Sequence, residues 1–164
     1  MNIIKSTGAL ALSTRLQVLS EQLRKDGALL YKEYDINFEP KWFPVIYTLH
    51  QKTELSVVEI ATEIGYSHPS TISLLKELEK EKIVQSKKDK TDERKRIIFL
   101  STKGEELIIK MLPVWSIING ALEEIIDNEH NLLKAINETE EKIKRSSFFQ
   151  RALVLKEKAK LNNL

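Results

Sequence analysis

The strongest chemical signal in the sequence is a cluster of basic residues between Lys82 and Arg96. This stretch carries a net charge of 7 − 3 = +4, whereas the whole chain of 164 residues carries only +2. A local positive charge of this kind suits phosphate binding, because neutralised phosphates release their counterions. The alternative to phosphate binding is that these residues form the tip of an ordinary β-hairpin and are simply solvated. The cations are Lys82, Lys87, Lys88, Lys90, Arg94, Lys95 and Arg96.

A second set of side chains lies on one face of the helix that Ser67 is predicted to cap. The opposite face of that helix is apolar at i, i+3, i+4 and i+7, which is typical of a core-facing stripe: Thr71, Leu74, Leu75 and Leu78. Small hydroxyls let a helix enter the major groove, and an isoleucine there can touch a thymine methyl group. Taken singly, such residues usually contact only water. Together they form a candidate DNA-reading face: His68, Ser70, Ile72, Ser73 and Lys76.

The elements around these residues predict a helix-turn-helix followed by a wing. Ser56 and Glu59 form a capping box that opens a helix, and that helix ends at Gly65. Residues 83–86 and 96–100 are β-prone, and the nine polar residues 87–95 between them predict a hairpin with a long tip. Residues 51–55 are consistent with a connection or a minimal strand.

Helices are predicted on both sides of this unit. A leucine stripe from about residue 9 to 34 packs either on its own domain or on a second copy of the chain. Ser101 and Thr102 cap a long helix with a kink expected at Pro113, and a last helical stretch runs from about 130 to 160. The predicted fold is mainly α, with N- and C-terminal dimerisation helices at 1–36 and 102–164 around a winged helix-turn-helix lobe at 37–101.

Other functional classes find little support in the composition. The chain has no cysteine, and His50, His68 and His130 share no metal-ligand spacing. There is no glycine-rich phosphate loop, nucleophile elbow or metal triad, so we expect no enzyme, catalytic residue, metal or cofactor. No apolar run reaches the roughly 18 residues of a membrane span, and no secretory leader is recognisable. We therefore expect a cytoplasmic protein without a membrane partner.

Four aromatic residues are candidates for a small-effector crevice between the dimerisation helices and the DNA-binding lobe. The alternative is that they simply fill the core. They are Trp42, Phe43, Tyr47 and Trp115.

Several runs together resemble the MarR family of bacterial regulators. They are Leu55 to Lys80, Asp89-Lys-Thr-Asp-Glu-Arg-Lys-Arg96, and Leu100-Ser-Thr-Lys-Gly104. Phe38-Glu-Pro-Lys-Trp-Phe-Pro44 and Ser67-His-Pro-Ser70 resemble a subgroup often fused to an acetyltransferase. The resemblance implies a winged-helix dimer with Arg94 in the minor groove, oriented by Asp92. Lys82 and Glu93 stand where this pattern usually has glycine, and either change can alter the path of the wing.

These observations predict a sequence-specific regulator that binds double-stranded DNA. A homodimeric repressor would bind a pseudo-palindromic site with half-sites about 10 bp apart, and a small ligand would relieve the repression. The alternative is a protein–protein interaction module on a winged-helix dimer. Such a module needs no wing with a net charge of +4, which favours DNA binding.

Overall fold

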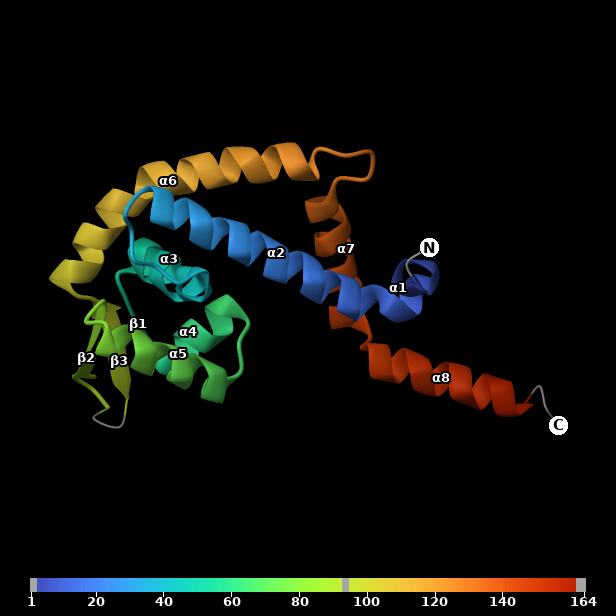
Figure 1. The fold of residues 1–164 in the computed structure, drawn as a ribbon. Coiled ribbons are helices and arrows are strands. Elements are labelled where there is room, and N and C mark those ends of the chain that lie inside the picture. The colour runs from blue at the N-terminus through green and yellow to red at the C-terminus, as the bar shows by residue number, and fades with distance from the viewer. Residues whose placement is uncertain (1–2, 93–94, 162–164) are drawn as a thin grey trace. The chain divides into compact units, whose positions relative to one another are not determined.

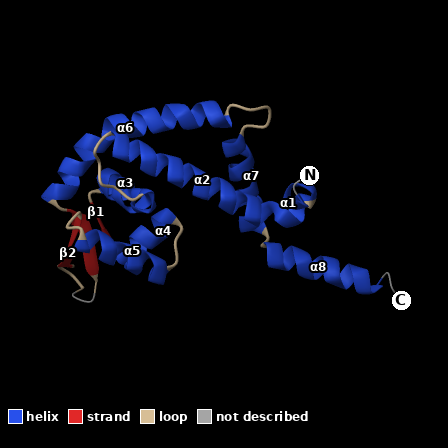
Figure 2. Cartoon of the chain, viewed as in Figure 1, coloured by secondary structure: helices blue, strands red, loops and turns tan. Residues whose placement is uncertain are grey.

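The computed structural model describes residues 3–92 and 95–161 of a mostly helical chain with one small sheet (Figures 1 and 2). The chain forms two compact units, divided between residues 116 and 117. The helices are α1 (Ile3–Ser6), α2 (Leu12–Glu33), α3 (Phe43–Lys52), α4 (Val57–Ile64), α5 (His68–Lys80), α6 (Thr102–Ile126), α7 (Leu132–Arg145) and α8 (Phe148–Leu161), with 3-10 turns at Gly8–Ala11 and Pro40–Trp42. No helix in the described ranges combines the length and apolar character that a membrane crossing needs.

The sheet has three antiparallel strands in the order β1-β3-β2, formed by β1 (Glu54–Ser56), β2 (Val84–Lys88) and β3 (Arg96–Leu100). The predicted wing hairpin is therefore confirmed, and residues 54–56 form the minimal strand that the sequence left open. In the register, Lys88 pairs with Arg96 and Val84 with Leu100. Strand β2 extends two residues beyond the predicted end, so the tip is 89–95 instead of 87–95.

The core of the first unit is built by α3, α4, α5, α6 and β3. The predicted inward stripe of α5 is confirmed, since all four of its members are buried. The stripe residues pack against side chains that have almost no contact with solvent. Apolar burial stabilises most at such fully buried positions. Those side chains include Ile46, Leu49, Ile60, Leu75, Leu78, Ile98 and Met111.

Three helices of the first unit end in the same left-handed Schellman turn, in which two N–H groups after the helix bond back to its last carbonyls. The left-handed residue is Gly65 after α4, Asp35 after α2 and Lys82 after α5, with φ of 69°, 52° and 59°. Ile83 N donates to Leu78 O at 2.9 Å and Lys82 N to Glu79 O at 2.9 Å, which completes the turn after α5. A lysine therefore takes the backbone conformation for which glycine is preferred.

The start of α6 is fixed tightly against this turn. The Ser101 hydroxyl donates to Lys82 O at 2.6 Å, and Ser101 N donates to Ile83 O at 3.0 Å. A Cβ atom on Gly104 would lie 2.2 Å from the carbonyl oxygen of Ile83, too close for any side chain. Gly104 is required here because two backbone segments meet without room for a methyl group.

The helices after residue 126 correct one prediction. The single helical stretch expected from about 130 to 160 is two helices, broken at Ser146 and Ser147. Ser147 Oγ accepts from Gln150 N at 3.2 Å, and Gln150 Oε1 accepts from Ser147 N at 2.8 Å. This reciprocal pair is a capping box, which starts a new helix. The Ser-x-x-Gln spacing in the sequence is the local signal for this break.

Many apolar side chains on the outer helices are exposed. On α8, Phe148 is 82% exposed and Phe149 67%, and on α2 the predicted leucine stripe is open at Leu12, Leu16 and Leu19. Among residues 132–145 and 148–160, whose burial the structure describes, no side chain of α7 or α8 belongs to the buried apolar core. The stripe of α2 is thus exposed at these three positions, whereas Leu23 and Leu30 further along it are half-buried.

Candidate nucleic-acid interface

Helix α5 turns its predicted polar face to solvent. His68, Ser70, Ser73 and Lys76 are exposed, and Ile72 is half-buried. Ser67 caps the helix by accepting from Ser70 N at 3.3 Å, and the two serine hydroxyls share a 2.8 Å hydrogen bond. The first turn is therefore held together by serines, and the rest of the face is open to a partner.

One end of α5 is fixed to the segment before α3. Glu77 accepts from Lys41 Nζ at 2.6 Å and from Trp42 Nε1 at 3.3 Å. The hydrogen bond from Lys41, followed by that from Trp42, lowers the pKa of Glu77 below its ordinary value. Since both charged groups are more than two-fifths exposed, the pair contributes little to stability and mainly sets the position of the helix.

The strands of the wing are fixed by two further ion pairs. Arg96 pairs with Glu79 on α5, and its Nε donates to Ser86 Oγ at 3.0 Å. Lys87 pairs with Glu54 on β1 and lies over the ring of Phe99, 5.3 Å from its centroid. Two of the predicted wing cations therefore join the wing to α5 and to β1. Lys88, Lys90 and Lys95 are exposed on the strand end and tip.

The tip of the wing is organised by Asp89. Its Oδ1 accepts from Thr91 N at 2.8 Å, from the Thr91 hydroxyl at 2.6 Å and from Asp92 N at 2.9 Å. These bonds, the Thr91 hydroxyl first, lower the pKa of Asp89 to about 2. From the sequence, Asp89 counted only as a charge. The signal for its role is an aspartate two residues before a threonine, the spacing of an Asx turn.

Asp92, the acidic residue predicted to orient the wing, is half-buried in the same loop. Lys95 N donates to the carbonyl of Asp92 at 2.8 Å, and Asp89 N donates to Lys95 O at 3.0 Å, which closes the tip. Glu93 and Arg94 lie outside the described residues, so the minor-groove role of Arg94 stays a prediction. The turn at Lys82 keeps its left-handed geometry despite the missing glycine.

Three of the four aromatic candidates come together. The ring centroids of Phe43 and Tyr47 are 5.2 Å apart, and Trp115 lies 5.4 Å from Phe43 and 5.5 Å from Tyr47. Phe43 and Tyr47 are exposed, whereas Trp115 is nearly buried and donates to the Tyr31 hydroxyl at 3.2 Å.

The fourth aromatic candidate lies with different neighbours. Trp42 packs edge-on against Phe38 at 5.8 Å and donates to Glu77 on α5. Burial raises the pKa of Tyr31, which packs on the other side of Phe38, and the hydrogen bond from Trp115 offsets part of that rise. In the described ranges, no three histidine or carboxylate side chains gather into a set that could hold a metal.

Comparison with known proteins matches the chain to one family model and to transcriptional regulators. The model of the MarR family matches residues 34–95. The HTH-type transcriptional regulator Hpr of Bacillus licheniformis is 33% identical over 109 residues, which cover 63% of this chain and 52% of that protein. Hpr of Bacillus thuringiensis is 32% identical over 124 residues, covering 70% and 65%. The chain therefore spans about half to two thirds of the length of these relatives.

Solved structures share the fold at lower identity. The DNA complex of MepR from S. aureus is 22% identical with a TM-score of 0.61, and covers 78% of this chain and 93% of that one. PcaV from Streptomyces coelicolor, in complex with its natural ligand, is 12% identical with a TM-score of 0.63, and covers 87% and 95%. The shared architecture is a winged helix flanked by long helices.

Proposed function

We propose that this chain is a winged-helix transcriptional regulator of the MarR family, which binds double-stranded DNA sequence-specifically and represses transcription as a homodimer. The observation that carries this proposal is the setting of α5. The helix is held by Lys41 and Trp42 through Glu77 and by Arg96 through Glu79, while Ser73 and Lys76 face solvent. A helix anchored by its buried apolar stripe, positioned by these pairs and exposed on its polar face, suits the major groove. Such a protein would work where the DNA is, in the bacterial cytoplasm.

The wing supports the same proposal from the adjacent element. Lys88, Lys90 and Lys95 are exposed around a tip whose backbone Asp89 holds in place. We assign these lysines to phosphate contacts and Arg94 to the flanking minor groove, with Asp92 as the residue that orients it.

Homodimerisation is the second part of the proposal. The exposed leucines of α2 and, separately, the exposed phenylalanines of α8 are apolar surfaces of the kind that a protein–protein interface buries. With two-fold symmetry, two α5 helices would read half-sites about 10 bp apart. Sedimentation should give twice the mass of 19.0 kDa at micromolar concentration; a mass of one chain would contradict the dimer.

A small effector is the third part. Phe43, Tyr47 and Trp115 form a cluster of aromatic rings in which Phe43 and Tyr47 are exposed to solvent. Such a cluster suits an aromatic acid or phenol. PcaV, which shares the fold, was solved with its natural ligand bound. Calorimetry with benzoate and salicylate tests this assignment; absence of heat for both would remove it. The likeness to regulators fused to acetyltransferases stays a sequence prediction.

DNA binding is tested by footprinting on the DNA upstream of the protein's own gene over a salt series. We expect a protected palindrome and a steep fall of affinity with salt. Lys76→Ala and Arg94→Ala should weaken binding and reduce the salt slope, each by about one phosphate contact. Lys134→Ala, an exposed lysine on α7, is the matched control. Equal affinity for operator and random duplex would refute sequence-specific binding and favour a protein-interaction module.

A further inference from the structure

Four buried aromatic side chains follow one another through the first unit and end at α5. Trp115 on α6 donates to the Tyr31 hydroxyl at 3.2 Å, and the rings of Tyr31 and Phe38 lie 4.9 Å apart. The ring of Phe38 lies 5.8 Å from that of Trp42, whose indole nitrogen donates to Glu77 on α5 at 3.3 Å. The two hydrogen bonds join residues 84 and 35 positions apart, so neither belongs to the packing within one helix. Trp115, Tyr31, Phe38 and Trp42 are called the aromatic series below.

The packing of the aromatic series makes its members move together. None of the four side chains is more than 9% exposed. The ring planes meet at 69° between Tyr31 and Phe38 and at 89° between Phe38 and Trp42, the edge-to-face geometry that aromatic pairs prefer. Close-packed interiors transmit strain, so a displaced ring displaces the ring that it packs on. A hydrogen bond at each end connects this motion to α6 and to α5.

At α5, the aromatic series fixes Glu77 more firmly than the ion pair beside it does. The side chain of Lys41, which pairs with Glu77 at 2.6 Å, is 46% exposed, and ion pairs of this kind are weak in water. Trp42 is 6% exposed, and its indole is packed against Phe38. The buried indole therefore sets where the carboxylate of Glu77 lies, and with it this turn of α5.

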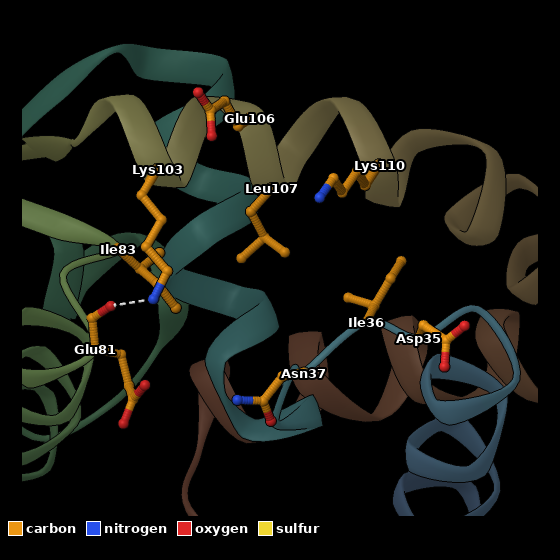
Figure 3. A pocket seen from close by; sticks show the side chains of 9 residues that line it. All are labelled: Asp35, Ile36, Asn37, Glu81, Ile83, Lys103, Glu106, Leu107 and Lys110. Carbon is orange, nitrogen blue, oxygen red and sulfur yellow. Dashed lines mark hydrogen bonds between the residues drawn. The ribbon is translucent and has the colours of Figure 1, made fainter.

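The turns after α2 and α5 offer only a weak second route between these helices. A cavity of about 290 Å³ is lined by both turns and by Leu107 of α6. Figure 3 shows Asp35 and Ile36, which follow α2, on one side, and Glu81 and Ile83, which follow α5, on the other. Because the cavity separates the two turns over this stretch, direct packing between them is reduced. The cavity also leaves room for a displacement of α5.

We propose that the aromatic series couples Trp115 on α6 to the position of α5, with Tyr31 and Trp42 as its positioning residues. Trp115 also packs on Phe43 and Tyr47, the cluster assigned above to an effector. A change in the packing of Trp115 would therefore reach the helix assigned to the major groove. This consequence rests on the proposed function, whereas the coupling itself is a property of the chain without DNA.

The two tryptophans of the chain provide one indole N–H signal at each end of the aromatic series. The test is NMR of the ¹⁵N-labelled full chain, with Trp42→Phe to assign the two signals. Tyr31→Phe removes the hydroxyl that accepts from Trp115 and keeps the ring, so the Trp115 signal should shift and the Trp42 signal should shift with it. Tyr34→Phe, the same change at an exposed tyrosine, should shift neither. A shift confined to Trp115 overturns the proposal.

The α5 end gives the reciprocal test, because an energetic coupling acts equally in both directions. Glu77→Ala removes the acceptor of the Trp42 indole, and we expect both indole signals to shift. Glu77→Gln keeps an acceptor oxygen without the charge that pairs with Lys41, so it should return the Trp115 signal to its original position. If Gln acts as Ala does, the ion pair positions α5 and the assignment to Trp42 is wrong. Glu77 is only half-buried, and thermal melting verifies folding.

A last pair of variants tests the route, since Phe43 follows Trp42 in the chain and lies 5.4 Å from Trp115. In a Phe38→Leu background, Glu77→Ala should no longer shift the Trp115 signal. In a Phe43→Leu background, at an exposed position, the shift should persist. Loss of the shift in Phe43→Leu would mean that the coupling bypasses the aromatic series and would overturn the proposal. All these measurements are made without DNA, so failure of the coupling and failure of DNA binding are separate results.

Discussion

The winged-helix lobe and the C-terminal helices differ in how far their apolar residues are buried. In the lobe, Leu75 and Leu78 on α5 are at most 1% exposed, and no buried side-chain polar atom in the described ranges lacks a partner. On α8, Leu155 is 66% exposed and Phe148 82%. Leucine is thus a core residue in one region and a surface residue in the other.

The difference indicates where each region obtains its stability. A helix of 14 residues is marginal in water by itself and needs tertiary packing. The lobe has that packing within one chain, through β3 and α6. Helix α8 lacks it, so its stability should depend on a second chain and hence on concentration.

One leucine truncation in each region tests this difference in stability most directly. Leu78→Ala should destabilise the lobe by about 2–5 kcal/mol, because it opens a cavity at a fully buried site. Leu155→Ala should leave the urea midpoint of the lobe almost unchanged at low protein concentration. Urea unfolding followed by tryptophan fluorescence measures both, and equal losses would contradict the contrast.

A second variant addresses the interface directly. Phe148→Ala should weaken dimerisation by about 2 kcal/mol, because large aromatic side chains dominate interface energies. Sedimentation equilibrium measures the dissociation constant, with Lys158→Ala as a surface control on the same helix. A dissociation constant equal to that of the unmodified chain would place the interface elsewhere.

The two serine capping boxes should show the same difference between the regions, with smaller effects. Ser56→Ala should cost the lobe about 1 kcal/mol of global stability, because α4 packs in the common core. Ser147→Ala should lower the stability of α8 alone by a similar amount, which faster amide hydrogen exchange in α8 would reveal. The reverse pattern would mean that α8 and the lobe unfold as one unit.

The smallest expected effect concerns the wing tip and pH. Asp89 has its pKa lowered to about 2, so its ionised form favours the turn. That contribution is complete above the ordinary value of 3.8 and disappears as pH falls through the lowered pKa. NMR titration of the Asp89 carboxyl carbon should show a midpoint near 2. A midpoint near 3.8 would mean that the turn does not form in solution.

Much of the lobe could be predicted from local patterns, and the failures have identifiable causes. The stripe of α5 and the capping box at Ser56 follow from spacing within one helix. The Asx turn at Asp89 and the capping box at Ser147 are equally local, and each is indicated only by a short polar spacing, Asp-x-Thr and Ser-x-x-Gln. The pairing of Arg96 with Glu79 joins residues 17 apart in the chain. No spacing rule predicts it, because it depends on how the wing folds back on α5.

One residue of the sheet has a mechanical consequence. Ser56 is the last residue of β1, opposite Ile97 of β3, and is also the cap of α4. A displacement of β3 would therefore be transmitted through its hydrogen bonds to β1 and from there directly to the first turn of α4, because no linker separates β1 from α4. We therefore expect a displacement of β3 to move the first turn of α4 as well.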